Sequence, residues 1–196
     1  TKPASRPPVI SGTTTRVRVA NLPAPKLSAA SSRLRWTCRS AAVAADSDAI
    51  AEAARAEGVK VTFLPFVVKA VVAALKKHPK LNATMDEERS ELVLHRRYDI
   101  GVASATEGGL IVPVLRGADG RSVVDLAREI ERLSAAAREH KLKLEELQGG
   151  TFTVTSTGTK GGVLATPILH HPQVAILGVH AITRKPAVVD EAIVIR

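Results

Sequence analysis

The sequence predicts an α/β protein in which a sheet and helices pack as a two-layer sandwich. Segments with apolar residues at helical spacing alternate along the chain with shorter segments of strand character. The 196 residues are 45% hydrophobic, which is enough for one domain with a core. Only 3% are aromatic, so we expect Val, Leu, Ile and Ala to build that core.

Two helices are predicted in the first half of the chain. Asp46–Glu57 has helical character and ends at Gly58, the residue type most common just after a helix. Phe63–Lys77 is the stronger pattern, because Pro65 fits a first turn and a His-Pro pair follows the last residue. Its apolar residues recur at helical spacing and are Phe63, Phe66, Val67, Ala70, Val71, Ala74 and Leu75.

A third helix is predicted to begin at Ser122, with Asp125 three residues later in a box-like capping arrangement. Its apolar stripe consists of Val123, Leu126, Ala127, Ile130 and Leu133. Strands are predicted where apolar residues alternate or cluster between turn residues. They are Glu91–His95, Tyr98–Ala105, Leu110–Leu115, Val174–His180 and an Ala187–Ile195 hairpin, with a turn at Glu107-Gly108-Gly109.

The most informative segment lies between Gly149 and Gly178. Its first part alternates with a period of two, so one face of a predicted strand carries threonines and the other carries Phe152, Val154 and Ser156. The threonines are Thr151, Thr153, Thr155 and Thr157, and glycines follow at Gly158, Gly161 and Gly162. A hydroxyl beside a glycine turn is able to donate to a substrate oxygen, although threonine-rich strands are also common at ordinary sheet edges.

This segment resembles the signature of the acyltransferase (E2) catalytic domain of 2-oxo acid dehydrogenase complexes. That signature reads roughly F-T-[IV]-S-[NS]-[LI]-G and is followed by P-x-x-A-I-L-G, which here are Phe152–Gly158 and Pro172–Gly178. Upstream, Gly109–Val114 is similar to the family's G-L-[IV]-V-P-V run, and Leu142–Gly150 to the segment that leads into the signature strand. The resemblance covers about residues 57–196.

The resemblance implies a chloramphenicol acetyltransferase-like fold and transfer of an acyl group between a lipoyl group, carried on a separate domain, and coenzyme A. In the family a histidine takes the proton of the incoming thiol, and a hydroxyl of the signature strand stabilises the oxyanion. The match places that hydroxyl at Thr155, where serine is usual, with Ser156 as second candidate. Substrate-binding roles are implied for Gly158, Gly161, Gly162 and His171.

The family's histidine belongs to a D-H-R-x-x-D-G motif that does not occur in this chain. We therefore expect residues 16–196 to be a partial catalytic domain, incomplete at the C-terminus, with negligible transfer by the chain as given. The competing hypothesis is a non-catalytic, core-forming homologue without the histidine base. The chain's own histidines are expected in structural or loop positions, with His170 and His171 beside the channel. This pair has no third ligand at a recognisable spacing, so no metal site is predicted.

Positive charge is concentrated near the N-terminus. Residues 1–45 hold eight Lys and Arg residues and no acid, whereas the remaining chain holds 20 basic and 19 acidic residues. The near-neutral body argues against nucleic acid as a partner, although a binding module built on the basic arm is a third hypothesis. Residues 1–15 are rich in Pro, Ser and Thr and are predicted to be a flexible linker. Residues 16–45 are atypical for the family.

Cys38 is the only cysteine, which excludes an intrachain disulfide and favours a reducing, cytoplasmic compartment. No apolar run reaches the roughly 18 residues of a membrane helix, so no membrane association is expected. The resemblance implies a trimer that assembles further, with the E1 and E3 components as partners. The apolar pairs Val163-Leu164 and Ile168-Leu169 suit a contact surface. The acyl group and the core symmetry are not set by these patterns.

Overall fold

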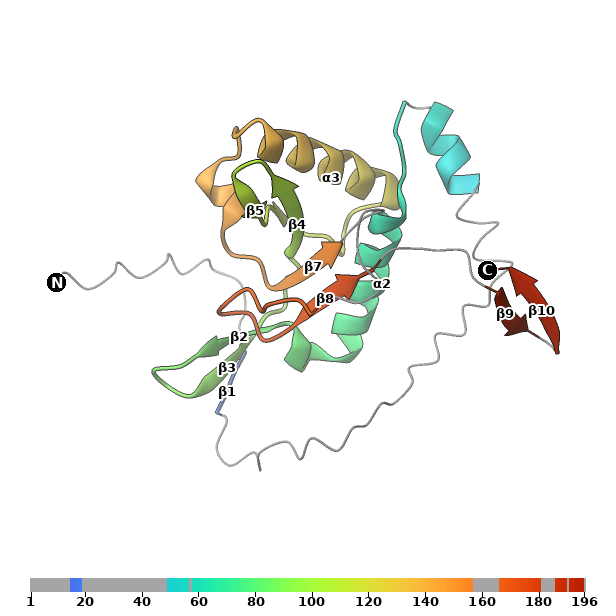
Figure 1. Cartoon of the computed structure of the whole chain (residues 1–196). Helices are drawn as coiled ribbons and strands as arrows, with labels where there is room; N and C mark the ends of the chain where they lie inside the picture. Colours follow the sequence, from blue (N-terminus) through green and yellow to red (C-terminus); the bar gives the residue numbers. More distant parts are fainter. Residues whose placement is uncertain are drawn as a thin grey trace.

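The computed structural model describes residues 15–18, 49–56, 58–156, 166–180, 186–189 and 191–195. A mixed five-stranded sheet and two helices that pack on one of its faces form the main body (Figure 1). In spatial order the strands are β5 (Gly109–Ile111), β4 (Ile100–Thr106), β7 (Phe152–Ser156) and β8 (Ile176–Val179), and β6 (Val114–Leu115) pairs with β4 beside this path. The helices are α2 (Phe63–Lys77) and α3 (Val123–Arg138). The predicted two-layer sandwich is confirmed.

The middle of the sheet is parallel. β4 pairs with β7 and β7 pairs with β8, whereas β5 and β6 run antiparallel to β4. The sequence predicts one strand over Leu110–Leu115, but the structure divides it into β5 and β6. The break falls at Pro113, which has no N–H to continue a ladder. Its carbonyl oxygen accepts a 2.9 Å hydrogen bond from the Val102 N–H.

Two smaller sheets complete the described strands. In one, β1 (Thr15–Arg18) and β2 (Ala83–Asp86) flank β3 (Glu91–Leu94), and in the other β9 (Pro186–Val189) pairs with β10 (Ala192–Ile195), which confirms the predicted hairpin. The sequence patterns do not reveal β2, because four residues are too few to show a period. The predicted linker lies outside the described residues except for Thr15, which begins β1.

The predicted glycine stop after the first helix is confirmed. Residues 49–56 are helical, and Gly58 follows with a φ of +72°. The Gly58 N–H donates to the Arg55 carbonyl at 3.0 Å, and the Val59 N–H donates to the Ala54 carbonyl at 2.9 Å. This pair of bonds is the Schellman arrangement, which uses otherwise unpaired carbonyls at a helix end.

The predicted capping box of α3 is also present. Ser122 Oγ accepts a 3.1 Å hydrogen bond from the Asp125 N–H, and Asp125 Oδ2 accepts one of 3.4 Å from the Ser122 N–H. The buried stripe of the helix contains Leu126, Ala127, Ile130, Leu133 and Ala137, close to the predicted set. Both the start and the phase of α3 are therefore readable in the sequence.

The phase of α2 differs from the sequence prediction. Its buried residues are Pro65, Val68, Val71, Val72 and Leu75. Phe63, predicted on the core face, is 57% exposed. Apolar residues occupy almost every position from Phe63 to Leu75, so the sequence shows a helix without showing which side of it faces the sheet.

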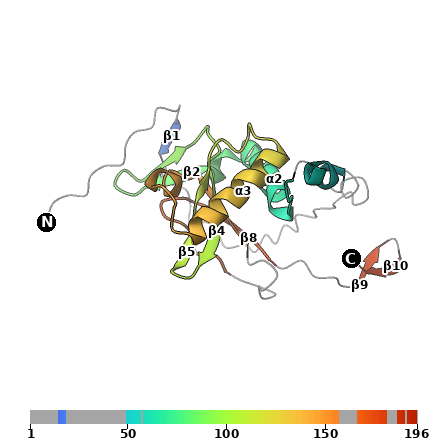
Figure 2. The ribbon, with the colours of Figure 1, turned by 90° about the horizontal axis from the view of Figure 1, so that it is seen from above.

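The main core lies between the helices and the sheet. Side chains of α2 and α3 meet those of β4, β6 and β7, and α3 crosses the sheet when the molecule is seen from above (Figure 2). The sheet contributes Ile100, Val102, Leu115, Phe152 and Val154. These are aliphatic with one exception, as the composition predicts.

Gly101 allows β4 and the segment around Val112 to approach closely. A Cβ at this position would lie 2.8 Å from Val112 Cγ1 and 2.9 Å from Thr153 Oγ1. Both distances are shorter than side chains tolerate, so only glycine fits without displacement.

His95, which follows β3 directly, is partly buried beside the small sheet. Its Nε2 lies 3.1 Å from Thr84 Oγ1, and its Nδ1 is buried without a hydrogen-bond partner among the described residues. Asn82 Nδ2 donates to the carbonyls of His95 and Arg97 at 2.9 Å each. Burial, and next the charge of Arg97, lower the pKa of His95 below its ordinary 6.5, while Asp99 acts in the opposite direction.

We predict that Gly101→Ala lowers the free energy of unfolding by about 1–3 kcal/mol, because the new methyl group overpacks the contact with Val112 and Thr153. Denaturant unfolding measures the change as a lower midpoint at constant slope. The matched control is Gly120→Ala, where the nearest atom to a new Cβ is the Gly117 carbonyl oxygen at 3.9 Å. Equal effects of the two substitutions would contradict the prediction.

A second prediction concerns pH. Because the pKa of His95 is lower in the folded than in the unfolded state, the unfolded chain binds more protons as pH falls below about 6.5. The stability contributed by neutral His95 is therefore present above that pH and lost as pH falls through the folded pKa. We expect His95→Gln to reduce the stability difference between about pH 7.5 and pH 5, measured by urea unfolding. Exposed His78→Gln is the control, and an unchanged difference in His95→Gln would refute the assignment.

Candidate functional site

Strand β7 separates the core from the candidate site. Phe152 and Val154 are buried in the core that includes α2 and α3, whereas Thr151 and Thr153 are buried on the opposite face. Thr155 belongs to this second, threonine face. The alternation predicted for the signature strand is confirmed.

Thr155 lies toward the carboxyl end of β7, between two strands. It pairs with Ala103 of β4 and with Gly178 of β8, and its side chain is partly buried. A Cβ on Gly178 would lie 2.8 Å from Pro167 Cγ. Pro167 therefore occupies the space beside Thr155 that a side chain at position 178 would otherwise fill. Ligands of open α/β sheets bind at the carboxyl ends of the parallel strands. Thr155, the predicted oxyanion donor, lies toward this end of the parallel strands.

Ser156, the second candidate, is the exposed last residue of β7. It is in register with Val179 and makes a further interaction of its own. The strand period places it on the face opposite to Thr155, so the two hydroxyls do not act on one atom. The predicted substrate-binding residues Gly158, Gly161 and Gly162 lie outside the described residues.

The start of β7 is held by Asp99 and Arg116, which sequence reasoning did not single out. The Asp99 carboxylate is buried, lies 3.2 Å from Arg116 Nη1, and accepts a 2.9 Å hydrogen bond from the Gly117 N–H. The Asp99 carbonyl oxygen accepts from the Thr151 N–H at 2.7 Å. Arg116 Nη2 donates to the carbonyls of Glu145 at 2.8 Å and Gln148 at 2.6 Å. One guanidinium thus fixes the segment that precedes the signature strand.

A second polar contact fixes the middle of β7. Thr153 Oγ1 donates to Gln173 Oε1 at 2.6 Å, and both residues are buried. Gln173 follows Pro172 in the loop before β8, and its backbone forms an isolated bridge with Thr84 of β2. In the family pattern Gln173 stands at an x position, so the motif gave no signal for it.

The histidines near β8 occupy two kinds of position. His171, predicted to bind substrate, is exposed, and its Nε2 lies 3.2 Å from Glu87 Oε1 on the β2–β3 turn. His170 beside it is exposed as well. His180, which follows β8, is different: its Nε2 lies 3.7 Å from the position of a Cβ on Gly178, and its Nδ1 is buried without a partner among the described residues. The two-residue spacing from Gly178 was the available signal for placing His180 on the threonine face.

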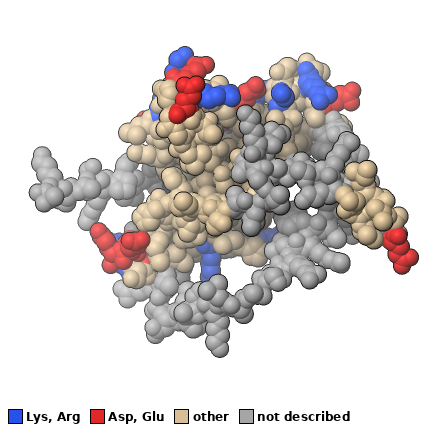
Figure 3. Space-filling model, in the orientation of Figure 1, with Lys and Arg blue, Asp and Glu red and all other residues tan. Residues whose placement is uncertain are grey.

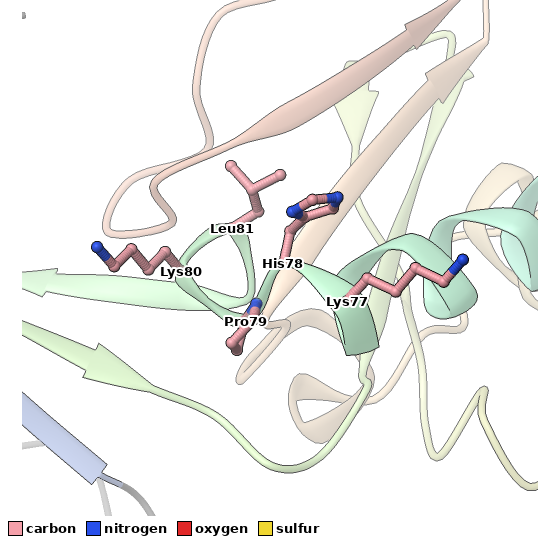
Figure 4. Close-up of a pocket in the computed structure, with 5 residues that line it drawn as sticks. All are labelled: Lys77, His78, Pro79, Lys80 and Leu81. Carbon is pink, nitrogen blue, oxygen red and sulfur yellow. The ribbon is translucent and has the colours of Figure 1, made fainter. Parts of the chain in front are cut away.

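A surface pocket of about 440 Å³ lies at the C-terminal end of α2 (Figure 4). Five consecutive residues line it, and the side chains of Lys77 and Lys80 extend in opposite directions from it. They are Lys77, His78, Pro79, Lys80 and Leu81. None of them was predicted as a site residue, and the pocket brings no two reactive groups into contact.

Within the described part of the chain, no group of three or more His, Cys, Asp or Glu side chains is placed to hold a metal ion. None of the helices in the same part has the length and apolar character needed to cross a membrane.

The chain is similar to proteins of known class. It is 47% identical over 143 residues to the dihydrolipoyllysine-residue acetyltransferase component of the pyruvate dehydrogenase complex of Staphylococcus epidermidis, a match of 73% of this chain and 33% of the relative. A Staphylococcus aureus protein of the same description is 46% identical over 143 residues, with the same coverage. The chain therefore spans about a third of the length of the curated relatives it matches.

Among solved structures, the dihydrolipoamide acetyltransferase (E2p) of Azotobacter vinelandii superposes with a TM-score of 0.74 at 37% identity, covering 79% of this chain and 64% of that one. The same values hold for a structure of the cubic core of the pyruvate dehydrogenase multienzyme complex. Residues 9–196 match the family described as the catalytic domain of 2-oxoacid dehydrogenase acyltransferases. The chain belongs to this family of acyltransferase catalytic domains.

Proposed function

We propose that this chain is part of an E2 acyltransferase of a 2-oxo acid dehydrogenase complex, which transfers an acyl group between lipoyl-lysine and coenzyme A. The observation that carries the proposal is Thr155, whose hydroxyl lies at the carboxyl edge of the parallel strands, in the family's signature strand. The acyl group is acetyl, an assignment supported by relatives that are acetyltransferase components of pyruvate dehydrogenase complexes.

The chemistry assigns one role to this chain's own residues. A thiolate attacks the carbonyl carbon of the acyl thioester, and the carbonyl oxygen becomes an oxyanion that needs a hydrogen-bond donor. Thr155 supplies that donor. Threonine retains the hydroxyl of the usual serine, and its methyl group restricts χ1 and so narrows the directions of the O–H. In the family, the base that takes the thiol proton is the histidine of the D-H-R-x-x-D-G motif, which is not among residues 1–196.

The proposed assembly is a trimer that joins into a larger core and works with E1 and E3 components. A related structure is the cubic core of a pyruvate dehydrogenase complex. On this chain, Ile168 is 90% exposed and Leu169 is 51% exposed in the loop before β8. Figure 3 shows mostly uncharged atoms in the middle of this view, with acidic side chains at its left border. Apolar residues on an uncharged surface favour a contact between copies.

A single cysteine supports a reducing location such as the cytoplasm.

One alternative function is a core-forming homologue without chemistry. The two functions differ in a single assay. The acyltransferase moves acetyl groups between acetyl-coenzyme A and dihydrolipoamide when the native gene product that contains this chain is supplied. The core-forming protein assembles but shows no transfer above the uncatalysed rate.

In that native protein, we predict that Thr155→Val lowers kcat by about 10²–10³, with a smaller change in KM, because the donated hydrogen bond forms mainly in the transition state. Steady-state transfer from acetyl-coenzyme A to dihydrolipoamide measures both constants. Ser156→Ala is the matched control, since its hydroxyl lies on the other face. A severe loss in Ser156→Ala together with a mild one in Thr155→Val would reverse the assignment.

We further predict that Ile168→Glu weakens self-association, because it adds a charge to the proposed apolar contact. Sedimentation velocity at micromolar concentration should show the native protein as trimers or larger species and the variant shifted toward monomer. Leu144→Glu is the control, because Leu144 is similarly exposed but belongs to the 3₁₀ turn η2 (Leu144–Leu147). Monomer alone in the native protein would contradict the proposed assembly.

A further inference from the structure

We propose that the buried hydrogen bond between Thr153 and Gln173 positions the catalytic hydroxyl of Thr155. This inference rests on the proposed function, because it assigns the pair a role in the same reaction. Neither residue is placed to touch the reacting atoms in this proposal. They act through the strand that carries Thr155.

The geometry of the pair is tightly determined on both sides. Thr153 is 1% exposed and Gln173 is 6% exposed, and their side-chain oxygens are 2.6 Å apart. A Cβ on Gly101 would lie 2.9 Å from Thr153 Oγ1, and a Cβ on Gly150 would lie 3.0 Å from Gln173 Nε2. Two residues without side chains therefore border the pair, and it has little room for a second arrangement.

Gln173 is itself fixed by its backbone. Its N–H donates to the His170 carbonyl at 2.9 Å, and the next N–H, that of Val174, donates to the Ala83 carbonyl at 3.2 Å. The Pro172 carbonyl accepts from the Met85 N–H at 2.8 Å. The side chain of Gln173 thus contacts β7 of the five-stranded sheet, while the backbone around Gln173 is bonded to β2 of the three-stranded sheet.

The link from this pair to the reaction is the strand itself. Thr153 and Thr155 are two residues apart on one face, a separation of about 6.5–7 Å along an extended chain. Beyond Thr153, β7 has only Val154, Thr155 and Ser156 before its end. A displacement of the strand at Thr153, perpendicular to the sheet, also displaces the backbone of Thr155. Misplacement of a catalytic group by about 1 Å can cost a factor of about 10² in rate.

The experiment is a double-mutant cycle in the native gene product, with acetyl transfer between acetyl-coenzyme A and dihydrolipoamide as the assay. Thr153→Val keeps the shape of the side chain and removes the donor, whereas Thr153→Ser keeps the donor. We expect Thr153→Val to lower kcat by about 10- to 100-fold with KM changed less than about twofold, and Thr153→Ser to restore most of the rate. In a Thr155→Val background, Thr153→Val should cause no further loss, because the hydroxyl it positions is gone.

A purely structural role gives a different result. The loss from Thr153→Val would then be the same factor in both backgrounds, and that outcome overturns the proposal, as does an unchanged kcat in the single variant. If thermal unfolding shows that Thr153→Val does not fold, Gln173→Met removes the acceptor instead and completes the same cycle. Failure of the proposed function is seen separately. The native protein would then show no transfer, or Thr155→Val would leave kcat unchanged.

Discussion

The buried carboxylate of Asp99 and its contact with Arg116 hold together the segments that begin β4, end β6 and lead into β7. Asp99 immediately precedes β4, Arg116 follows β6, and the carbonyl groups bound by Arg116 belong to the segment that leads into β7. Three segments of the chain are therefore aligned at the start of the central strands by the ion pairs of Asp99 with Arg97 and Arg116 and by the hydrogen bonds of Arg116. Removing Asp99 leaves both Arg97 and Arg116 without their shared carboxylate, whereas removing Arg116 leaves Asp99 paired with Arg97 alone. The parallel register of β4 and β7 begins directly beside this contact.

One face of β7 is buried by apolar packing, and the other forms hydrogen bonds. The helix side holds Phe152 and Val154, which contribute to the core through apolar burial. On the threonine side each of the first two hydroxyls has its own hydrogen-bond partner. Thr151 bonds to the backbone of Asp99, and Thr153 bonds to Gln173. Thr155 is the last threonine of the described strand and lies nearest its carboxyl edge. The apolar core and the polar threonine face are thus formed by alternate residues of a single strand.

Features governed by neighbouring residues were predictable from the sequence, whereas those governed by distant contacts were not. The Ser122 capping box, the Gly58 stop and the alternation of β7 each depend on residues within five positions of one another. The prediction that Phe63 of α2 faces the core was wrong. That helix is apolar on nearly all sides, so only packing selects the face that is buried. At the site, the resemblance indicated Thr155, but the residues that hold its strand required the structure. Gln173 contacts Thr153 across 20 residues, a relation without a local pattern.

The pairing of β4 with β7 also determines how the chain acquires its fold during synthesis. Asp99 and Thr151, which join at the start of the two strands, are 52 residues apart, and α3 lies between them. A ribosome adds about 5–20 residues each second, so β4 is exposed for roughly 3–10 s before β7 emerges. During this interval the antiparallel partners β5 and β6 are the strands already available to β4. They cover part of its backbone early, and so limit wrong pairing between nascent chains.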